Sequence, residues 1–574
     1  MNPRHVWAVS ATSTTVLIFS AWYWLNLYHG KALQSIVYTP KVTPYGVYTS
    51  VWEVCIYHVW FLVLGSVVDG NSLLTQLARW QHHDRPGLEH RVHSDLRQVL
   101  TARPSADETT PSRNNDADFT AVTMPKSIED GAENIVVAHS ARTIFYHAIQ
   151  TLLDERFEET GVRKLRIGTH SVQFGSFYRL LQTLPDATIE FVQMDFHPLH
   201  WTLDAQSVDV EAFRSCDLIL VQHVFGVPLP QDPLLELGKR YNIPVMEDCV
   251  QSGSLYGSYQ GHPGADLTLW SGGLDKIPSC LGGGFAYFRN TPHGNKLYQA
   301  CRDRNEALPV DSWRDRALSI FKQFVHLAIA KNTLGIDNLL GFTGYAWLRE
   351  HHGNAIPWYH IGLQVRKDKA LAPFQHETSK FLRRPSAAQL LAMRYGVRKT
   401  LHYEKVARLE ISQRAFLLSH IPSQYHHKLF PWMTTEVLLA HERNLGISEF
   451  TWVVAPDAAS RRRFTQFLSD RFVIALINTT WEYNGDNIGK DICQRLVYLP
   501  NLNEMTQAQI KHVASVLTAW SEEEQLDDMS ETPSKSTTAQ ATKITNSETR
   551  QEGIQLQVNP IVNVPEYIVT AQSS

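Results

Sequence analysis

The chain has few cysteines that could form disulfides or bind a metal. Its six cysteines are scattered along 574 residues and form no CxxC pair. The sequence therefore predicts neither a disulfide framework nor a zinc site, and we expect no metal. Charge is nearly balanced, with 53 basic and 57 acidic residues and a net charge of −4. Such a composition does not indicate nucleic-acid binding, because there is no excess of basic residues and no long basic run.

Charged residues are missing altogether near the N-terminus. From His5 to Gly30 there is no Asp, Glu, Lys or Arg, and a Trp22-Tyr23-Trp24 cluster lies near the end of the apolar run. About 20 apolar residues suffice to cross a bilayer, and aromatic residues favour its interface. We therefore expect a membrane anchor within residues 1–75. A cleaved signal peptide is the alternative, but the stretch is long for one and shows no small-residue cleavage site.

A second apolar run, Cys55 to Val68, is shorter. It could be the return leg of a hairpin, an interfacial helix or a helix packed on protein. More basic residues follow this run than lie in the loop before it, and the positive-inside rule then places both ends in the cytosol. We expect a membrane-anchored protein whose catalytic part faces the cytosol, with the endoplasmic reticulum as one candidate membrane.

The remaining chain is an ordered region between two polar segments. Residues 76–125 are expected to be a linker and residues 521–574 a disordered tail, because neither holds enough apolar surface to order itself. Between them short apolar runs alternate with helical patterns, which predicts an α/β fold with a mostly parallel sheet and ligands at the carboxyl ends of its strands. Residues 126–520 contain no charge-free run of spanning length, so this region is expected to fold without residues 1 to about 120.

The most specific chemistry lies between Asn242 and Arg289. A short apolar run ends at Met246 and is followed by Glu247-Asp248, and a second strand-like run is followed by Ser271, Lys276 and Gly282-Gly283-Gly284. Pyridoxal phosphate (PLP) requires such a set. A lysine carries it as a Schiff base, a carboxylate keeps its ring nitrogen protonated, and hydroxyls with helix-start amides bind its phosphate.

Several segments in this order resemble the DegT/DnrJ-type sugar aminotransferases, which have fold type I of the PLP-dependent transferases. The matching segments are DLILVQHVFGVPLPQDPLLELGKRYNIPV, VMEDCVQSG, SGGLDK, LGGG, RRPSAAQLLAM and LVYLPNLNEMTQAQIKHV. The resemblance spans residues 126–520. It implies a large PLP-binding domain over 126–345 with a mostly parallel, seven-stranded-type sheet, a smaller α+β C-terminal domain over 346–520, and a homodimer.

The resemblance also implies roles for four residues near the acid and the lysine. Lys276 would carry the cofactor and act as the catalytic base, and Asp248 would pair with its ring nitrogen. Gln251 stands where the family places His or Gln near the cofactor's phenolic oxygen. Ser271 matches a phosphate contact, although an exposed serine is the simpler interpretation.

The expected phosphate loop departs from the family pattern. Ser140 matches and can cap a helix that begins after it, but Ala141 and Arg142 replace Gly and Thr. Helix-start amides still bind phosphate, and Arg142 could add a bidentate contact or lie on the surface. Phe174 is the candidate for stacking on the cofactor ring, and a core phenylalanine is the alternative. In the family the glycine run after the lysine contains an acid, and this chain has Gly282 there. The family's Asn-Tyr-Arg, which reaches across the dimer, is absent at 382–384, so the resemblance does not carry over a phosphate contact from the partner chain.

Together these features predict a membrane-tethered PLP-dependent aminotransferase. Its amino donor would be an amino acid such as glutamate, and its acceptor a keto-sugar or another carbonyl compound. One alternative is an acyl-CoA-dependent synthase of the same fold, although such enzymes typically carry His where Gln251 stands. The other alternative is a non-catalytic scaffold of this fold, which the altered phosphate loop favours and the acid–lysine pair disfavours.

Overall fold

The computed structural model describes residues 85–101, 134–311, 381–431 and 451–530, with short gaps inside the last three ranges. The two apolar runs expected to form the anchor lie outside these residues. In the part of the chain that is described, no helix is both long and apolar enough to cross a bilayer. Contacts divide the chain into one compact unit of residues 1–523 and a second of residues 524–574. The expected domains 126–345 and 346–520 both fall in the first unit, and the boundary between them stays a prediction.

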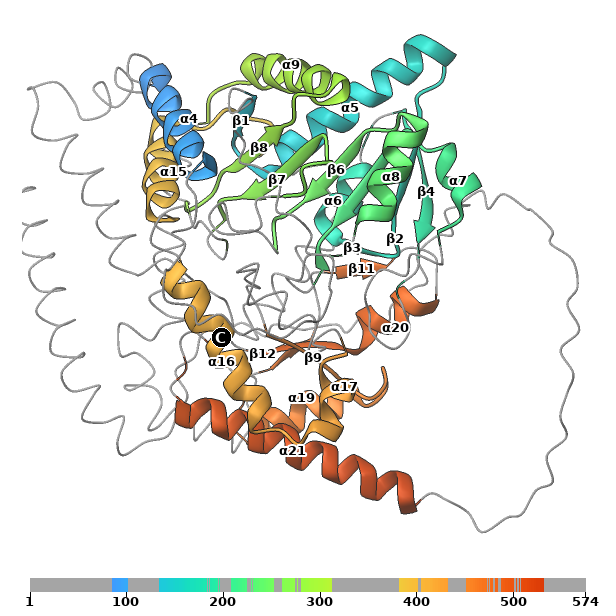
Figure 1. Ribbon diagram of the computed structural model, residues 1–574, viewed down its shortest axis with the longest axis vertical. Coiled ribbons are helices and arrows are strands. Elements are labelled where there is room, and N and C mark those ends of the chain that lie inside the picture. The colour runs from blue at the N-terminus through green and yellow to red at the C-terminus, as the bar shows by residue number, and fades with distance from the viewer. Residues whose placement is uncertain are drawn as a thin grey trace, which may run out of the picture. The chain divides into compact units, whose positions relative to one another are not determined.

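A seven-stranded sheet forms the centre of the fold (Figure 1). Its strands, in spatial order, are β1 (Ile135–Ala138), β8 (Gly284–Phe288), β7 (Leu267–Ser271), β6 (Val245–Asp248), β5 (Leu218–Gln222), β2 (Lys164–His170) and β4 (Thr188–Met194). Only β8 runs against the others, pairing antiparallel with β7 and with β1. The mostly parallel α/β sheet predicted from the sequence is therefore present. Strands β1, β5, β6 and β8 are buried along their whole length, which explains why they read as continuous apolar runs.

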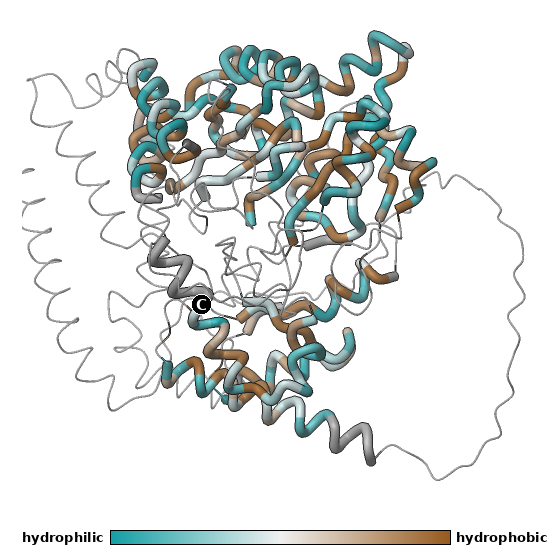
Figure 2. Tube along the Cα trace, in the orientation of Figure 1, coloured by the Kyte–Doolittle hydropathy of each residue, from teal (hydrophilic) through white to brown (hydrophobic). Residues whose placement is uncertain are grey.

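Helices cover both faces of the sheet because successive strand residues point to opposite sides. Leu218 and Leu220 of β5 pack in the core cluster that includes helices α5 (Ala141–Thr160), α6 (Gly175–Gln182) and α9 (Pro292–Ala307). Ile219 and Val221 pack in the cluster that includes α7 (Val210–Arg214) and α8 (Asp232–Tyr241). Figure 2 shows hydrophobic residues gathered in the strands and hydrophilic ones along the outer parts of α5 and α9. The sheet is thus the middle layer of three.

Helix α4 (Arg85–Thr101) corrects the prediction of a linker over residues 76–125 for the part that the structure describes, residues 85–101. Its apolar residues Leu88, Val92 and Leu96 are buried in one cluster with β1, β8 and helix α15 (Ala387–Thr400). Asp95 also pairs with Arg394 and Arg398 of α15, at 2.8 and 2.9 Å. The linker was predicted from the polar composition of the segment as a whole. Its apolar residues recur at helical spacing, and this narrow stripe is buried because α15 supplies a complementary face.

The C-terminal elements form a second, smaller sheet with helices. Strands β9 (Thr451–Val454), β10 (Leu476–Ile477) and β12 (Leu496–Leu499) pair antiparallel in the order β10-β12-β9. The accompanying helices are α16 (Glu404–Ser419), α17 (His426–Leu429), α19 (Arg461–Asp470), α20 (Asn487–Arg495) and α21 (Gln507–Ser530), with a 3-10 turn at Ser423–Tyr425. A two-stranded ladder joins β11 (Trp481–Tyr483) to β3 (Val172–Phe174). Because α21 continues to Ser530, the prediction of a disordered tail from residue 521 is wrong for residues 521–530, and residues 531–574 lie outside the described part of the chain.

Candidate active site

The acid predicted from the sequence lies at the carboxyl end of β6. Asp248 is 4% exposed, and its two carboxylate oxygens accept different hydrogen bonds. Oδ1 accepts from the backbone amide of Val250 at 3.0 Å, and Oδ2 accepts from Nε2 of Gln222 at 2.9 Å. Burial raises the pKa of Asp248, while these two hydrogen bonds and the nearby charge of Lys276 act in the opposite direction. Burial outweighs these contacts, so the protonated form of Asp248 is favoured more than that of a carboxyl group in water.

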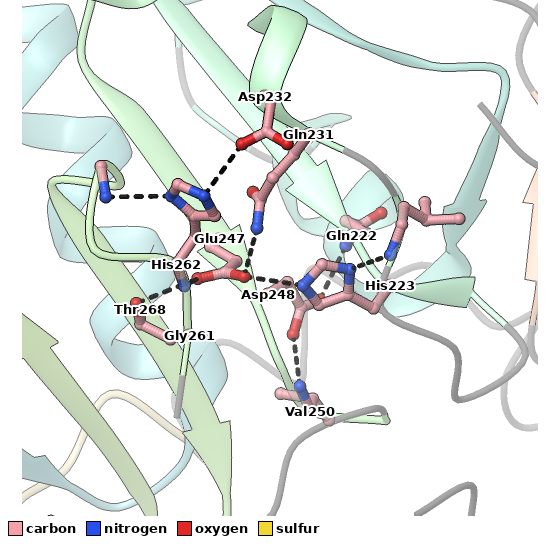
Figure 3. A network of polar contacts seen from close by, with 12 residues as sticks. Gln222, His223, Gln231, Asp232, Glu247, Asp248, Val250, Gly261, His262 and Thr268 are labelled. Atoms are coloured by element: carbon pink, nitrogen blue, oxygen red, sulfur yellow. Dashed lines mark hydrogen bonds and ion pairs between the residues drawn. The ribbon is translucent and has the colours of Figure 1, made fainter. Parts of the chain in front are cut away.

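The neighbouring acid, Glu247, has hydrogen-bond partners different from those of Asp248 (Figure 3). It is fully buried, and its Oε1 lies 2.8 Å from Nε2 of His223 and 2.7 Å from Nε2 of Gln231. Its Oε2 accepts from the amide of His262 at 2.7 Å and from the hydroxyl of Thr268 at 3.2 Å. The network ties β5, β6 and β7 to the start of α8. Glu247 therefore has a structural role that its sequence position beside Asp248 did not indicate.

The ligand atoms of His223, Glu247 and Cys249 lie within 4.8 Å of one another, close enough to suggest a metal site. The backbone amide of Leu229 donates to Nδ1 of His223 at 3.0 Å. The ring proton must then be on Nε2, which donates it to Glu247. Both ring nitrogens of His223 are engaged in hydrogen bonds, and neither offers a lone pair to a cation. The cluster is better explained as a hydrogen-bond network than as a metal centre.

Lys276 lies in the loop between β7 and β8 and is only 7% exposed. The loop is closed at its base, where the Gly272 amide donates to the Gly283 carbonyl at 2.9 Å and the Gly282 amide donates to the Gly272 carbonyl at 2.8 Å. Ser271, the last residue of β7, accepts from the amide of Gly273 through its hydroxyl at 3.2 Å. Lys276 therefore follows the carboxyl end of β7, at the edge of the sheet where β6 also ends.

The start of α5 reaches the same edge. Ser140 caps the helix, and its hydroxyl accepts from the amide of Thr143 at 3.3 Å, as the sequence predicted. Ser140 also forms a bridge with Gly283, and Ala141 is buried. A Cβ on Gly284 would lie 2.1 Å from the backbone nitrogen of Ala141. A glycine is required there for the helix start to approach the sheet so closely.

Two other predicted residues have described contacts that differ from their predicted roles. The guanidinium of Arg142 lies 5.4 Å from the centre of the Phe381 ring, a cation–π contact. Phe174 is half-buried at the end of β3, with its ring edge-to-face against Phe177 at 5.7 Å between centroids. Gln251 is buried just beyond the end of β6. No contact described here tests their cofactor roles, so those roles stay predictions.

Gln222 is the site residue that sequence reasoning missed. It ends β5 as Asp248 ends β6, and the two are register partners in the sheet. The signal was available, since the run Leu218–Val221 ends in a polar residue at the carboxyl end of a buried parallel strand. The same edge therefore gathers Gln222, Asp248, Ser271, the loop of Lys276 and the start of α5.

Comparison with known proteins gives only distant similarity. No family model matches the chain, and no match is found among curated proteins. Among solved structures, the aminotransferase TlmJ from Streptoalloteichus hindustanus is similar at 13% identity and a TM-score of 0.46, over 80% of this chain and 98% of that one. A candidate sugar aminotransferase from Streptococcus pneumoniae, in its PMP form, has 11% identity and a TM-score of 0.48, over 86% and 100%. At this distance the similarity assigns no function, which has to be inferred from the residues of the site.

Proposed function

We propose that this chain is a PLP-dependent aminotransferase, with an amino acid, such as glutamate, as donor and a keto-sugar or another carbonyl compound as acceptor. The observation that carries the proposal is the burial of Asp248 and Lys276 at one edge of the sheet, where the lysine's charge partly offsets the rise in pKa that burial gives the acid. The sequence resemblance to sugar aminotransferases supports the same conclusion.

The residues of this edge fit the chemistry of the cofactor. The buried carboxylate of Asp248 has a pKa raised by desolvation, and a cationic ring nitrogen beside it would compensate its charge. Lys276 offers a buried primary amine, the nucleophile that forms a Schiff base with an aldehyde. The capped start of α5 and the hydroxyls of Ser140 and Ser271 are donors suited to a phosphate.

Each residue then has a defined task. When bound, PLP supplies an electron sink for the α-carbon of the donor. Asp248 keeps a proton on the ring nitrogen, Lys276 holds the cofactor and moves a proton at the donor's α-carbon, and the start of α5 with Ser271 anchors the phosphate. Gln251 would lie near the phenolic oxygen. Membrane attachment through residues 1–75, a cytosol-facing catalytic part and a homodimer complete the proposal.

A trapping experiment tests it. The protein is incubated with PLP and reduced with borohydride, and the labelled peptide is mapped. We expect the label on Lys276, its loss in Lys276→Ala, and its retention in Lys296→Ala, which removes an exposed lysine paired with Glu155. Glutamate should convert the bound cofactor to its amine form, which neither an acyl-CoA-dependent synthase nor a scaffold would do. A wild-type protein that takes up no PLP would refute the proposal.

A further inference from the structure

Gln222 links the catalytic acid to the strand that bears the candidate stacking aromatic. It is 1% exposed, and its side-chain amide spans two partners. Its Oε1 accepts from the backbone amide of Phe174 at 3.1 Å, and its Nε2 donates to Oδ2 of Asp248 at 2.9 Å. One side chain therefore sets the spacing between the end of β3 and the acid at the end of β6.

The orientation of this amide is fixed by chemistry. A backbone N–H can only donate, so the amide oxygen of Gln222 must face Phe174. The amide NH₂ must then face Asp248, where a carboxylate can only accept. The backbone of Gln222 is held as well, since Nε2 of the fully buried His170 lies 2.7 Å from its carbonyl oxygen. A flipped amide would place two donors together at Phe174 and two acceptors together at Asp248.

The carboxylate of Asp248 is consequently fixed in its plane. The Val250 amide holds one oxygen and Gln222 holds the other, so rotation about the last side-chain bond would break both contacts. A hydrogen bond to a charged acceptor is among the stronger ones, and here it is shielded from water. Gln222 can therefore orient the carboxylate of Asp248 without itself taking part in the chemistry.

We propose that Gln222 is a positioning residue for PLP, which fixes the carboxylate of Asp248 against the ring nitrogen and sets its distance from Phe174. This inference rests on the proposed function. Gln222 touches neither the cofactor nor the substrate in this scheme and acts through Asp248. Its effect should therefore appear in how cofactor affinity depends on pH, and not only in the stability of the fold.

Three variants separate these effects. Gln222→Met keeps the bulk and removes both hydrogen bonds, whereas Gln222→Glu keeps the acceptor for Phe174 and replaces the donor to Asp248 with a like charge. Gln231→Met is the matched control, because Gln231 is also a buried glutamine, 3% exposed, that donates at 2.7 Å to the neighbouring carboxylate Glu247. The carboxylate to which it donates is Glu247 and not Asp248.

The dissociation constant of PLP is measured by fluorescence titration of the cofactor-free protein across pH, with thermal unfolding in parallel. We expect Gln222→Met to weaken PLP binding roughly 10-fold, as for the loss of one charge-assisted hydrogen bond. The acidic limb of the affinity profile should move to higher pH, and further in Gln222→Glu. Gln231→Met should lower the unfolding temperature and leave the affinity profile in place.

The outcomes are distinguishable. If the wild-type protein binds PLP and Gln222→Met binds it with the wild-type pH profile, the positioning role is wrong and the proposed function stands. If Gln231→Met shifts the profile as much as Gln222→Met does, the effect is one of general packing and the inference is also wrong. A wild-type protein that binds no PLP overturns both the inference and the proposed function.

Discussion

Gly284 lies against Ala141 so closely that a Cβ on the glycine would stand 2.1 Å from the alanine's backbone nitrogen and 2.2 Å from the carbonyl carbon of Ser140. Rotation of a side chain cannot relieve a contact with backbone atoms. The first residue of β8 therefore lies directly against the first turn of α5, and its register partner in β7 is Ser271, the other residue of the proposed phosphate site.

Gly284→Ala should force these two elements apart. We expect the free energy of unfolding to fall by roughly 1 to 3 kcal/mol, the usual cost of overpacking, and PLP affinity to fall with it. Urea unfolding and PLP titration measure the two effects. The control is Gly87→Ala in α4, where the nearest atom to the new Cβ would be Nη1 of Arg91 at 3.6 Å. That change should stabilise the protein by roughly 0.5 to 1 kcal/mol, and equal behaviour of the two variants would contradict the assignment.

Asp248→Asn tests the choice of carboxylate. The variant keeps the shape of the side chain and removes the charge that holds a proton on the ring nitrogen. PLP should still bind, whereas conversion of the bound cofactor by glutamate, followed by absorbance, should slow by roughly two orders of magnitude or more. Asp266→Asn provides the comparison, since Asp266 is a buried carboxylate bound to the amide of Val245. Unchanged kinetics in Asp248→Asn would mean that another acid has this role.

The affinity for PLP should depend on pH through Asp248. In the cofactor-free protein burial raises the pKa of this group, so the folded state holds its proton more tightly than the unfolded chain does. Asp248 therefore favours folding most below its ordinary value of 3.8, and this contribution is lost as pH rises through the raised pKa. The cationic ring nitrogen needs the ionised acid, so affinity should increase over the same window. Titration of PLP at several pH values should show this increase of affinity with pH in the wild type and its absence in Asp248→Asn.

Removal of α4 should damage the site from a distance. Met393 of α15 packs against Gly283 at the end of the lysine loop, and α4 packs on α15. A protein that begins at Arg85 should keep its PLP affinity, whereas one that begins after Thr101 should lose stability and cofactor. Leu96→Ala offers a smaller test, with an expected loss of roughly 2 to 5 kcal/mol in the free energy of unfolding. If the shorter protein bound PLP normally, residues 85–101 would indeed be dispensable, as the prediction of a linker implied.

Much of the fold could be predicted because its signals are local. Buried strands such as Leu218–Val221 read as apolar runs, and Ser140 reads as a helix cap from its own residue type. The acid at Asp248 follows from the same logic, since a polar residue that ends a buried parallel strand reaches the ligand-binding edge of the sheet. These features depend on short stretches of chain, and the structure has them where the sequence predicted them.

The sequence by itself thus determined the α/β sheet, its capped first helix, and the acid and lysine that suggest the cofactor. Only the tertiary structure decided that residues 85–101 belong to the core, that Glu247 is structural, and that Gln222 holds Asp248. Each of these depends on partners distant in sequence: α15 for α4, His223 and Thr268 for Glu247, and Phe174 for Gln222. A buried polar side chain acquires its role from the group that satisfies its hydrogen bonds, and that group is known only once the chain has folded.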